Sequence, residues 1–233
     1  MKNIILSAIG CLCILLAISC KKDEPLLTPI SFDFSKQHHS WVAGFADYSD
    51  TYDDLDLKAE MAPLPASLNP SGKTTGFKVE GKNSPGDLFM FIKRKMTGLD
   101  PNQTYSITAN IQFASDAPKG AIGIGGAPGE AVFLKAGAVA FEPKVSKNAQ
   151  GTYVINVDKG NQGQSGKNMK IIGNVAKADD KPGYVSLVRK AEKMTVKTNT
   201  DGECWIIIGT DSGYEGLTRL YYQKIDLEIT EVK

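Results

Sequence analysis

Alternation of apolar and polar residues is the main pattern along this chain of 233 residues. The alternation is unbroken over residues 105–113 and recurs over residues 221–229. Because the side chains of a strand point alternately to its two faces, each segment predicts a strand with one buried and one solvated face. Shorter apolar or β-branched runs predict further strands at 76–80, 88–92, 131–134, 152–157 and 204–208.

Turn residues separate these runs, as in Ser84-Pro85-Gly86 and Asp201-Gly202. The runs 88–92 and 204–208 do not alternate, which predicts central strands covered on both faces. Only residues 184–191 keep a helical spacing of apolar side chains, and they predict one short helix. About ten short strands with almost no helix indicate an all-β, jelly-roll-like antiparallel β-sandwich.

The N-terminus has a different character. After Lys2, an apolar run over residues 4–18 ends at Ser19-Cys20. The run is too short to span a bilayer and has the length of a signal-peptide core. Ser19-Cys20 resembles the lipobox of bacterial lipoproteins, although Ala17 stands where that family prefers leucine. The resemblance implies a signal peptide over 1–19, a lipidated Cys20 with a flexible tether over 20–30, and a folded domain over 31–233.

Residues 21–24, Lys-Lys-Asp-Glu, follow this cysteine directly. They resemble the acidic export signal that sends some lipoproteins of Gram-negative bacteria to the outer face of the outer membrane. The resemblance implies a protein held in the outer membrane through acylated Cys20, and it favours the surface-exposed face over the periplasmic one. A generic solvated linker is the alternative interpretation.

The charge balance and the cysteine content exclude some classes of binding partner and an intrachain disulfide. Lys2 is one of 27 basic residues, so the chain beyond the leader balances 26 basic against 26 acidic side chains. This balance argues against nucleic acid, which requires a basic face. Cys11 and Cys13 lie in the leader and Cys20 would carry lipid, so Cys204 is left without an intrachain disulfide partner. Its apolar neighbours predict a buried structural thiol.

Two resemblances concern the domain itself. Residues 98–105, Gly-Leu-Asp-Pro-Asn-Gln-Thr-Tyr, resemble the entry into a long strand in many jelly-roll carbohydrate-binding modules, and residues 220–225 resemble their last strand. Most of the domain is similar to a family of uncharacterised bacterial outer-membrane lipoproteins. The segments that carry this similarity are 44–48, 87–91, 123–126, 158–162 and 209–213. The first resemblance implies carbohydrate binding by analogy of fold, and the second implies no activity.

Two other motifs do not carry a function. The glycine-rich segment 120–129 matches neither spacing of a phosphate-binding loop, and no predicted helix follows it. It predicts a strand that bends or lets another backbone approach closely. Asp211-Ser212-Gly213, with His39 upstream, has the order of a serine-protease triad, but Thr210 and Tyr214 replace the flanking glycines. We interpret this motif as a turn.

An acidic segment follows the first strands. Five aspartates lie between residues 47 and 56, and their oxygens are ligands that Ca²⁺ prefers. Jelly-roll modules often hold a Ca²⁺ ion, so the resemblance allows one here. The segment lacks the Asp-x-Asp-x-Asp-Gly pattern, and a solvated acidic loop is the alternative.

Sugar binding requires flat apolar rings next to amides or carboxylates, because pyranose faces are apolar and their rims carry hydroxyl groups. The candidate ligand-binding residues are Trp41, Asp47, Tyr48, Tyr52, Glu130, Asn161, Gln162, Asp211, Tyr214 and Glu215. Trp41 has an alternative role in closing the sandwich core. Glu130 enters as one of two carboxylates that a glycoside hydrolase would need, paired with Asp211 or Glu215.

The loops 44–48 and 211–215 each place an aromatic ring beside a carboxylate. We expect both loops to border one surface, with Tyr48 or Tyr214 stacking on the ligand and Asp47 or Asp211 accepting its hydrogen bonds. The leading function is therefore non-catalytic binding of a carbohydrate at the cell envelope. A structural or adhesive role with a protein partner is the first alternative, and a glycoside hydrolase-like enzyme is the second.

Overall fold

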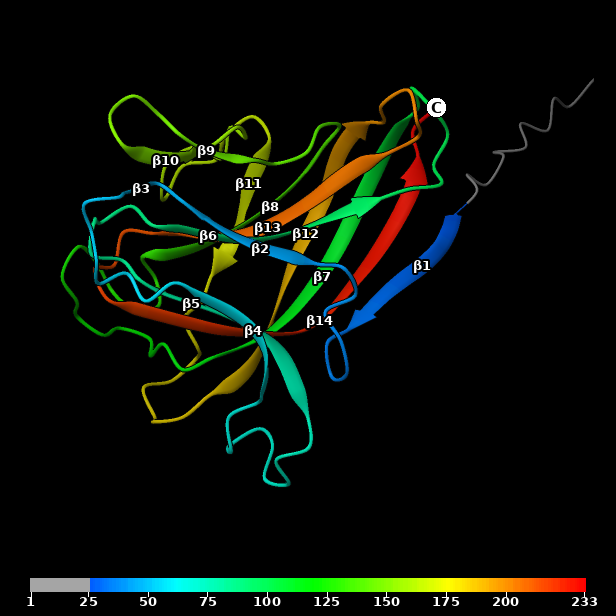
Figure 1. Ribbon diagram of the computed structural model, residues 1–233. Helices are drawn as coiled ribbons and strands as arrows, with labels where there is room; N and C mark the ends of the chain where they lie inside the picture. Colours follow the sequence, from blue (N-terminus) through cyan, green and yellow to red (C-terminus); the bar gives the residue numbers. More distant parts are fainter. Residues whose placement is uncertain (1–25) are drawn as a thin grey trace, which may run out of the picture.

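The protein is a sandwich of two antiparallel β-sheets, described by a computed structural model over residues 26–233. Figure 1 shows the strands of the two main sheets crossing the molecule. The first sheet has the order β12 (Val185–Lys197), β7 (Thr104–Ser115), β14 (Leu217–Glu231), β5 (Thr75–Lys82) and β4 (Lys58–Pro63), and β1 (Leu26–Asp33) pairs with β14. The second sheet has the order β11 (Met169–Asn174), β8 (Val132–Val139), β13 (Cys204–Ser212), β6 (Phe89–Met96) and β2 (Val42–Ala46).

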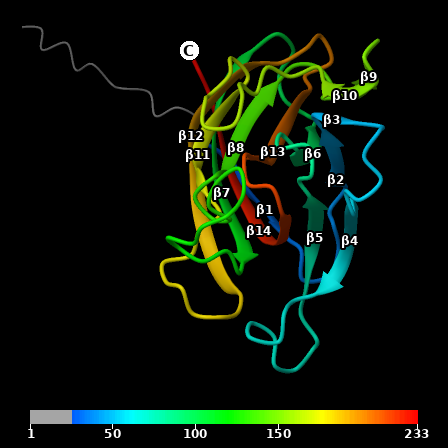
Figure 2. The same cartoon turned by 90° about the vertical axis from the view of Figure 1, so that its left-hand side faces the viewer.

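A third, small sheet lies on the outer face of the second sheet. Its strands are β3 (Tyr48–Ser49), β10 (Thr152–Ile155) and β9 (Val145–Lys147). Figures 1 and 2 show these strands together at one corner of the molecule. We call residues 140–168, which contain β9 and β10, the cover. Val157 of the cover packs with Phe89, Phe91 and Ile207 in a second, smaller core.

The expected all-β antiparallel sandwich is confirmed. In β7, the five apolar residues of the alternating pattern are all buried, and the polar residues between them are partly exposed. The strand lies between β12 and β14 in the first sheet, so its buried face forms the centre of the main core.

The prediction that both faces are covered is confirmed for 88–92 and for 206–208, whereas Trp205 is partly exposed. Ile92 and Ile208 face the main core, whereas Phe91 and Ile207 face the second core under the cover. Cys204 is fully buried, and burial raises the pKa of its thiol to about 12. The predicted structural thiol is therefore confirmed, because a thiolate would not form here at neutral pH.

The short helix predicted over 184–191 is wrong. These residues enter β12, which pairs with β7 over its whole length, and Leu187 turns inward while Val188 is 57% exposed. A bulge between Ala191 and Met194 interrupts the alternation. The pairing with β7 satisfies the backbone groups that a helix would have bonded internally, so tertiary context decides the structure of this segment.

Trp41 lies inside the sandwich. Its side chain is 1% exposed and its ring lies edge-on to Phe32 at 5.7 Å between ring centroids. Such burial excludes Trp41 from stacking on a ligand, so its alternative role in closing the core is the correct one.

The glycine-rich segment 120–129 connects β7 to β8 as a series of turns and not as a bent strand. Gly125 has a φ of +71°, and a Cβ there would collide with the carbonyl oxygen of Gly213. The predicted close approach of another backbone is therefore confirmed, but the predicted strand is wrong.

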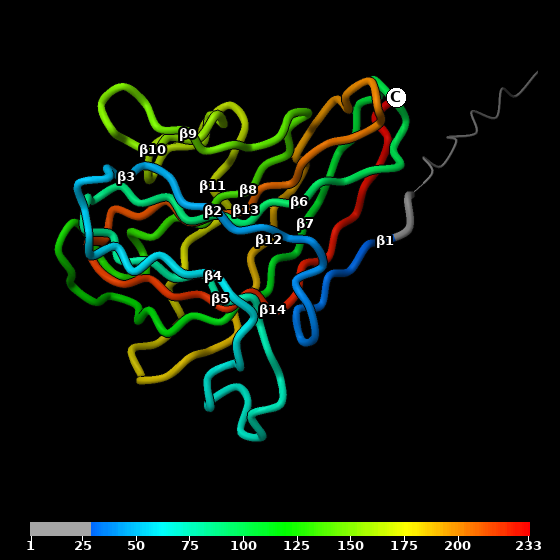
Figure 3. Tube along the Cα trace, viewed as in Figure 1, coloured from blue at the N-terminus to red at the C-terminus, as the bar shows by residue number. Residues whose placement is uncertain are grey.

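The first strand begins at Leu26, whose backbone pairs with Thr230, so the folded domain starts earlier than the predicted residue 31. The trace in Figure 3 shows the start of β1 and the C-terminus on the same side of the molecule. Cys20, the predicted signal peptide and most of the predicted tether lie outside the described residues. Residues 26–233 contain no helix of the length and apolarity that crossing a membrane requires.

Candidate functional site

Two hollows lie near β3, one lined by Tyr48 and the other by the preceding residue Asp47. The first, which we call the groove, has a volume of about 420 Å³ and runs between the edge of the second sheet and the cover. Its wall on the sheet side comes from β2 and β6, and its wall on the cover side includes Pro143 and Val145. Apolar side chains make up most of its surface.

Two tyrosines form one wall of the groove. Tyr48 of β3 and Tyr153 of β10 are paired across the strands, and their rings stack at 4.8 Å between centroids with 23° between the planes. Both rings are half-buried. Burial raises the pKa of Tyr48, and the neighbouring Tyr153 adds to this effect, so the Tyr48 phenol stays protonated at neutral pH.

The floor of the groove depends on a glycine. A Cβ at Gly44 of β2 would collide with the Phe91 ring, which also lines the groove. At the end of the groove, Lys93 Nζ donates hydrogen bonds to Glu142 Oε1 at 2.9 Å and to the Pro143 carbonyl at 2.6 Å. The Lys93 head is therefore held in place next to the rings.

Beneath the cover, a buried network of charges ties the second sheet to the loop 158–166. Asp211 of β13 and Lys135 of β8 are both fully buried, and Lys135 Nζ lies 2.7 Å from Asp211 Oδ2. Lys135 Nζ also donates to the carbonyl oxygens of Lys159 and Gln164, each at 2.9 Å. The Lys135 ammonium thus has three acceptors, which is as many as it can use.

Lys159 extends the network to the loop before β3. Its Nζ lies 2.7 Å from Asp211 Oδ2 and 2.8 Å from Asp47 Oδ2. The backbone N–H of Gln162 donates to Asp211 at 2.9 Å. Among residues 26–233, Asp211 Oδ1 has no hydrogen-bond partner. Asp211 therefore holds the loop and the sheet together and offers no exposed oxygen to a ligand.

Burial and, to a smaller extent, neighbouring charges shift the pKa values of the groups in this network. Burial raises the pKa of Asp47, although Lys159 opposes the shift, and burial also raises the pKa of Asp87 against the charge of Lys159. Burial lowers the pKa of Lys135, because Asp211 offsets only part of the desolvation. For Lys159, burial is the largest single effect and acts downward, but the charges of Asp211 and Asp47 outweigh it and raise its pKa.

The second hollow, which we call the depression, lies over this network and has a volume of about 310 Å³. Asp47, Asp87, Asp158, Lys159 and Asn161 contribute to its lining. It is more polar than the groove, and it contains no aromatic ring on which a sugar would stack.

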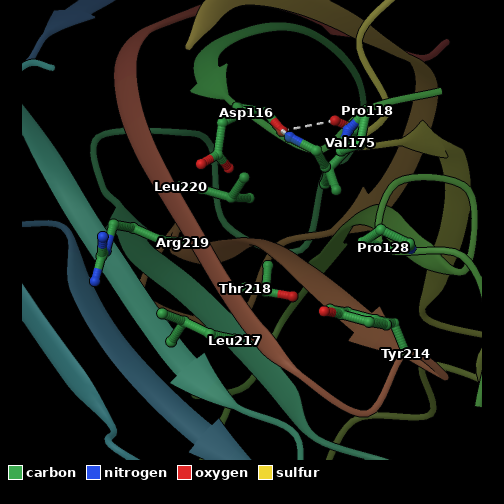
Figure 4. Close-up of a pocket in the computed structure, with 11 residues that line it drawn as sticks. Asp116, Pro118, Pro128, Val175, Tyr214, Leu217, Thr218, Arg219 and Leu220 are labelled. Atoms are coloured by element: carbon green, nitrogen blue, oxygen red, sulfur yellow. Dashed lines mark hydrogen bonds between the residues drawn. The ribbon is translucent and has the colours of Figure 1, made fainter. Parts of the chain in front are cut away.

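The segments 44–48 and 211–215, expected as loops, include the ends of β2 and β13, and the structure brings them together only in part. Lys159 bridges Asp47 and Asp211, and Asn161 and Gln162 lie in the same loop as Lys159. Tyr48 lines the groove, but Tyr214 lines a separate hollow of about 250 Å³ beside the start of β14. Figure 4 shows the Tyr214 hydroxyl directed toward Thr218 in that hollow.

The remaining candidates lie apart from the groove. Tyr52 is 40% exposed in the loop after β3 and does not line the groove. Glu130 Oε1 accepts a hydrogen bond from the Gly120 N–H at 2.7 Å, and Glu215 is exposed beside the glycine-rich segment. Because Asp211 is buried and paired with lysines, Glu130 and Asp211 do not form the carboxylate pair that glycoside cleavage requires.

The acidic segment 47–56 does not gather its carboxylates around one point. Asp50 pairs with Lys147, Asp54 pairs with Lys82, and Asp47 pairs with Lys159. Within the described part of the chain, no three His, Cys, Asp or Glu side chains are placed to hold a metal ion. Asp47, Asp50 and Asp54 are therefore each engaged by a lysine, and the Ca²⁺ site that the sequence pattern allows stays a prediction.

Three residues of this surface do not appear among the sequence-based candidates. They are Tyr153 and Lys93 of the groove and Trp205 of β13, a partly exposed ring that lies 5.1 Å from Lys93 Nζ. Tyr153 stands in a short run that predicts a strand, and Trp205 stands in a run that predicts burial on both faces. Their exposure depends on where the cover ends, which has no signal in the local sequence.

No family model matches the sequence, and no curated protein matches it. Among solved structures, a promiscuous carbohydrate-binding module of the β-sandwich superfamily is 11% identical with a TM-score of 0.40, covering 84% of this chain and 60% of that one. A mannan-recognising module is 14% identical with a TM-score of 0.41, covering 87% and 96%. An adhesin domain of Lys-gingipain from Porphyromonas gingivalis is 13% identical with a TM-score of 0.34, covering 88% and 98%. Similarity this distant transfers no binding specificity.

Proposed function

We propose that this domain binds a carbohydrate without catalysis, and that the groove beside Tyr48 and Tyr153 is its binding site. The observation that supports the proposal is the stacked tyrosine pair in an open, mostly apolar groove. Aromatic rings contact the apolar faces of pyranoses, and their hydroxyl groups remain available to the hydroxyl rim.

The groove also supplies polar groups in a fixed arrangement. Lys93 Nζ is oriented by Glu142 and Pro143, so little side-chain entropy remains to be lost when a ligand binds. The two phenols donate or accept hydrogen bonds as a hydroxyl requires. In this proposal, the buried network around Asp211 positions the cover and does not touch the ligand.

A glycan array followed by titration calorimetry on residues 21–233 tests this proposal. We expect Tyr153→Ala and Tyr48→Ala each to weaken binding about tenfold or more, because removing an aromatic anchor from a binding surface costs about 1–2 kcal/mol or more. Tyr52→Ala is the matched control, since this exposed tyrosine does not line the groove, and it should bind like the unchanged protein.

Two results would contradict the assignment. The first is an array on which no glycan binds above background, which would favour a structural or adhesive role with a protein partner. The second is a bound glycan whose affinity is the same for Tyr153→Ala as for Tyr52→Ala. Thermal unfolding of each variant separates lost binding from lost folding.

We further propose that Cys20 anchors the domain to the outer membrane, on the surface-exposed side. The support is the apolar leader that ends at Ser19-Cys20 and the Lys-Lys-Asp-Glu segment after it. The test is to express the variants in cells that are given a labelled fatty acid. Cys20→Ser should incorporate no label. Cys204→Ser should be labelled normally, because it keeps Cys20 and the thiol it lacks is buried in the core. Equal labelling of both variants would refute lipid attachment at Cys20.

A further inference from the structure

We infer that the binding surface continues from the groove onto Trp205, and that the ligand is therefore a chain of several sugar units and not a single terminal sugar. This inference rests on the proposed function and adds the length of the ligand to it. Three features carry the argument: the place where the cover ends, the lysine that the groove shares with Trp205, and the spacing of the strands.

The cover leaves Trp205 accessible. Trp205 and Ile207 point to the same outer face of the second sheet, because they are two residues apart in β13. Ile207 is fully buried in the second core, whereas Trp205 is partly exposed. The cover therefore ends between these two positions. A large indole ring is left on an open sheet face that neither the main core nor the second core includes.

Lys93 links this ring to the groove. It lines the groove, and its Nζ also lies 5.1 Å from the centroid of the Trp205 ring. Lys95 Nζ lies 5.9 Å from the same ring, and it is held by Glu203 at 3.1 Å. Paired amines and carboxylates next to an aromatic ring supply the hydrogen-bond donors and acceptors that a second sugar unit requires.

The strand register sets the distance between the far side of the groove and the strand of Trp205. Val42 of β2, which lines the groove and is 52% exposed, pairs with Lys93 of β6, and β6 pairs with β13. Lys93 therefore lies one strand spacing from the strand of Trp205 and Val42 lies two, a distance of about 10 Å. A single pyranose ring does not span this distance, but a short chain does.

The test uses the chain length of the ligand as its variable. The probes are β-1,4-linked gluco-, manno-, xylo- and galacto-oligosaccharides of one to six units, titrated into residues 21–233 by calorimetry. We expect the affinity of the unchanged protein to increase with chain length beyond the disaccharide. Trp205→Ala should lower the affinity for the longest bound oligosaccharide at least tenfold more than the affinity for the disaccharide.

Two further variants separate this extension from a structural role. Trp205→Phe keeps an aromatic face and should retain most of the length dependence, whereas Tyr153→Ala should weaken the binding of every length. Equal losses at all lengths for Trp205→Ala, or no loss at any length, would overturn the extension. If Tyr153→Ala still weakens binding in that case, the proposed groove stands alone. If no probe binds the unchanged protein, the inference and the groove assignment both fail for these glycans.

Discussion

Asp211→Ala is expected to lower the free energy of unfolding by about 3–5 kcal/mol, because it strands buried ammonium groups in the second sheet. Lys135 is fully buried and has Asp211 as its only carboxylate partner among residues 26–233. For a domain of this size, the melting temperature should fall by roughly 6–20 °C. Urea unfolding followed by circular dichroism measures the effect.

Two comparisons make this result specific. Asp226→Ala removes a carboxylate that is 38% exposed and pairs with Lys224, so its expected cost is only about 0–1 kcal/mol. The double variant Lys135→Met/Asp211→Leu replaces both charges with apolar side chains and should recover much of the lost stability. A loss below about 1 kcal/mol for Asp211→Ala, or a double variant no better than the single one, would show that the network is not a stabilising link.

Phe89→Ala is expected to detach the cover from the second sheet. Phe89 is fully buried in the second core, where its ring stacks on Phe91 at 5.4 Å between centroids. Removing a buried phenylalanine costs about 3–5 kcal/mol. Because the second core holds the cover, we expect amide hydrogen exchange to accelerate in residues 140–168 more than in β7 or β14.

Phe113→Ala is the matched control for this prediction. Phe113 is equally buried, but it lies in the main core on β7. Its loss should lower global stability by a similar amount and accelerate exchange in both sheets without selecting the cover. Uniform acceleration in Phe89→Ala would mean that the cover and the sandwich unfold as one unit, and the groove would then be as stable as the core.

Strands with one buried and one solvent-exposed face could be predicted from the alternation of apolar and polar residues. Residues 105–113 are such a case, and they form β7 as expected. The alternation over 221–229 predicts the strand but not its register, because a bulge between Tyr222 and Lys224 turns Tyr222 into the core and leaves Tyr221 partly exposed. An extra residue in one strand shifts every side chain before it to the other face.

Fewer residues of the candidate site than of the fold could be predicted from the sequence. Loop chemistry pointed to Asp47 and Asp211, which Lys159 does join, but it gave no sign that Asp211 would be fully buried. Tyr153 became a candidate only when β10 paired with β3, more than a hundred residues earlier in the chain. Contacts between such distant segments depend on the sheet order, which single-sequence patterns do not determine.

The early start of β1 limits how far the domain could stand from a lipid on Cys20. If Cys20 carries the proposed lipid, the chain from Cys20 to Leu26 is a leash of at most about 20 Å. Figures 1 and 2 place β3, β9 and β10 on the opposite side of the molecule from the start of β1. In that case the small sheet, and the groove beside it, lie on the side of the domain away from the bilayer. With so short a tether, the domain would stay close to the bilayer and would bind only ligands that come near the membrane.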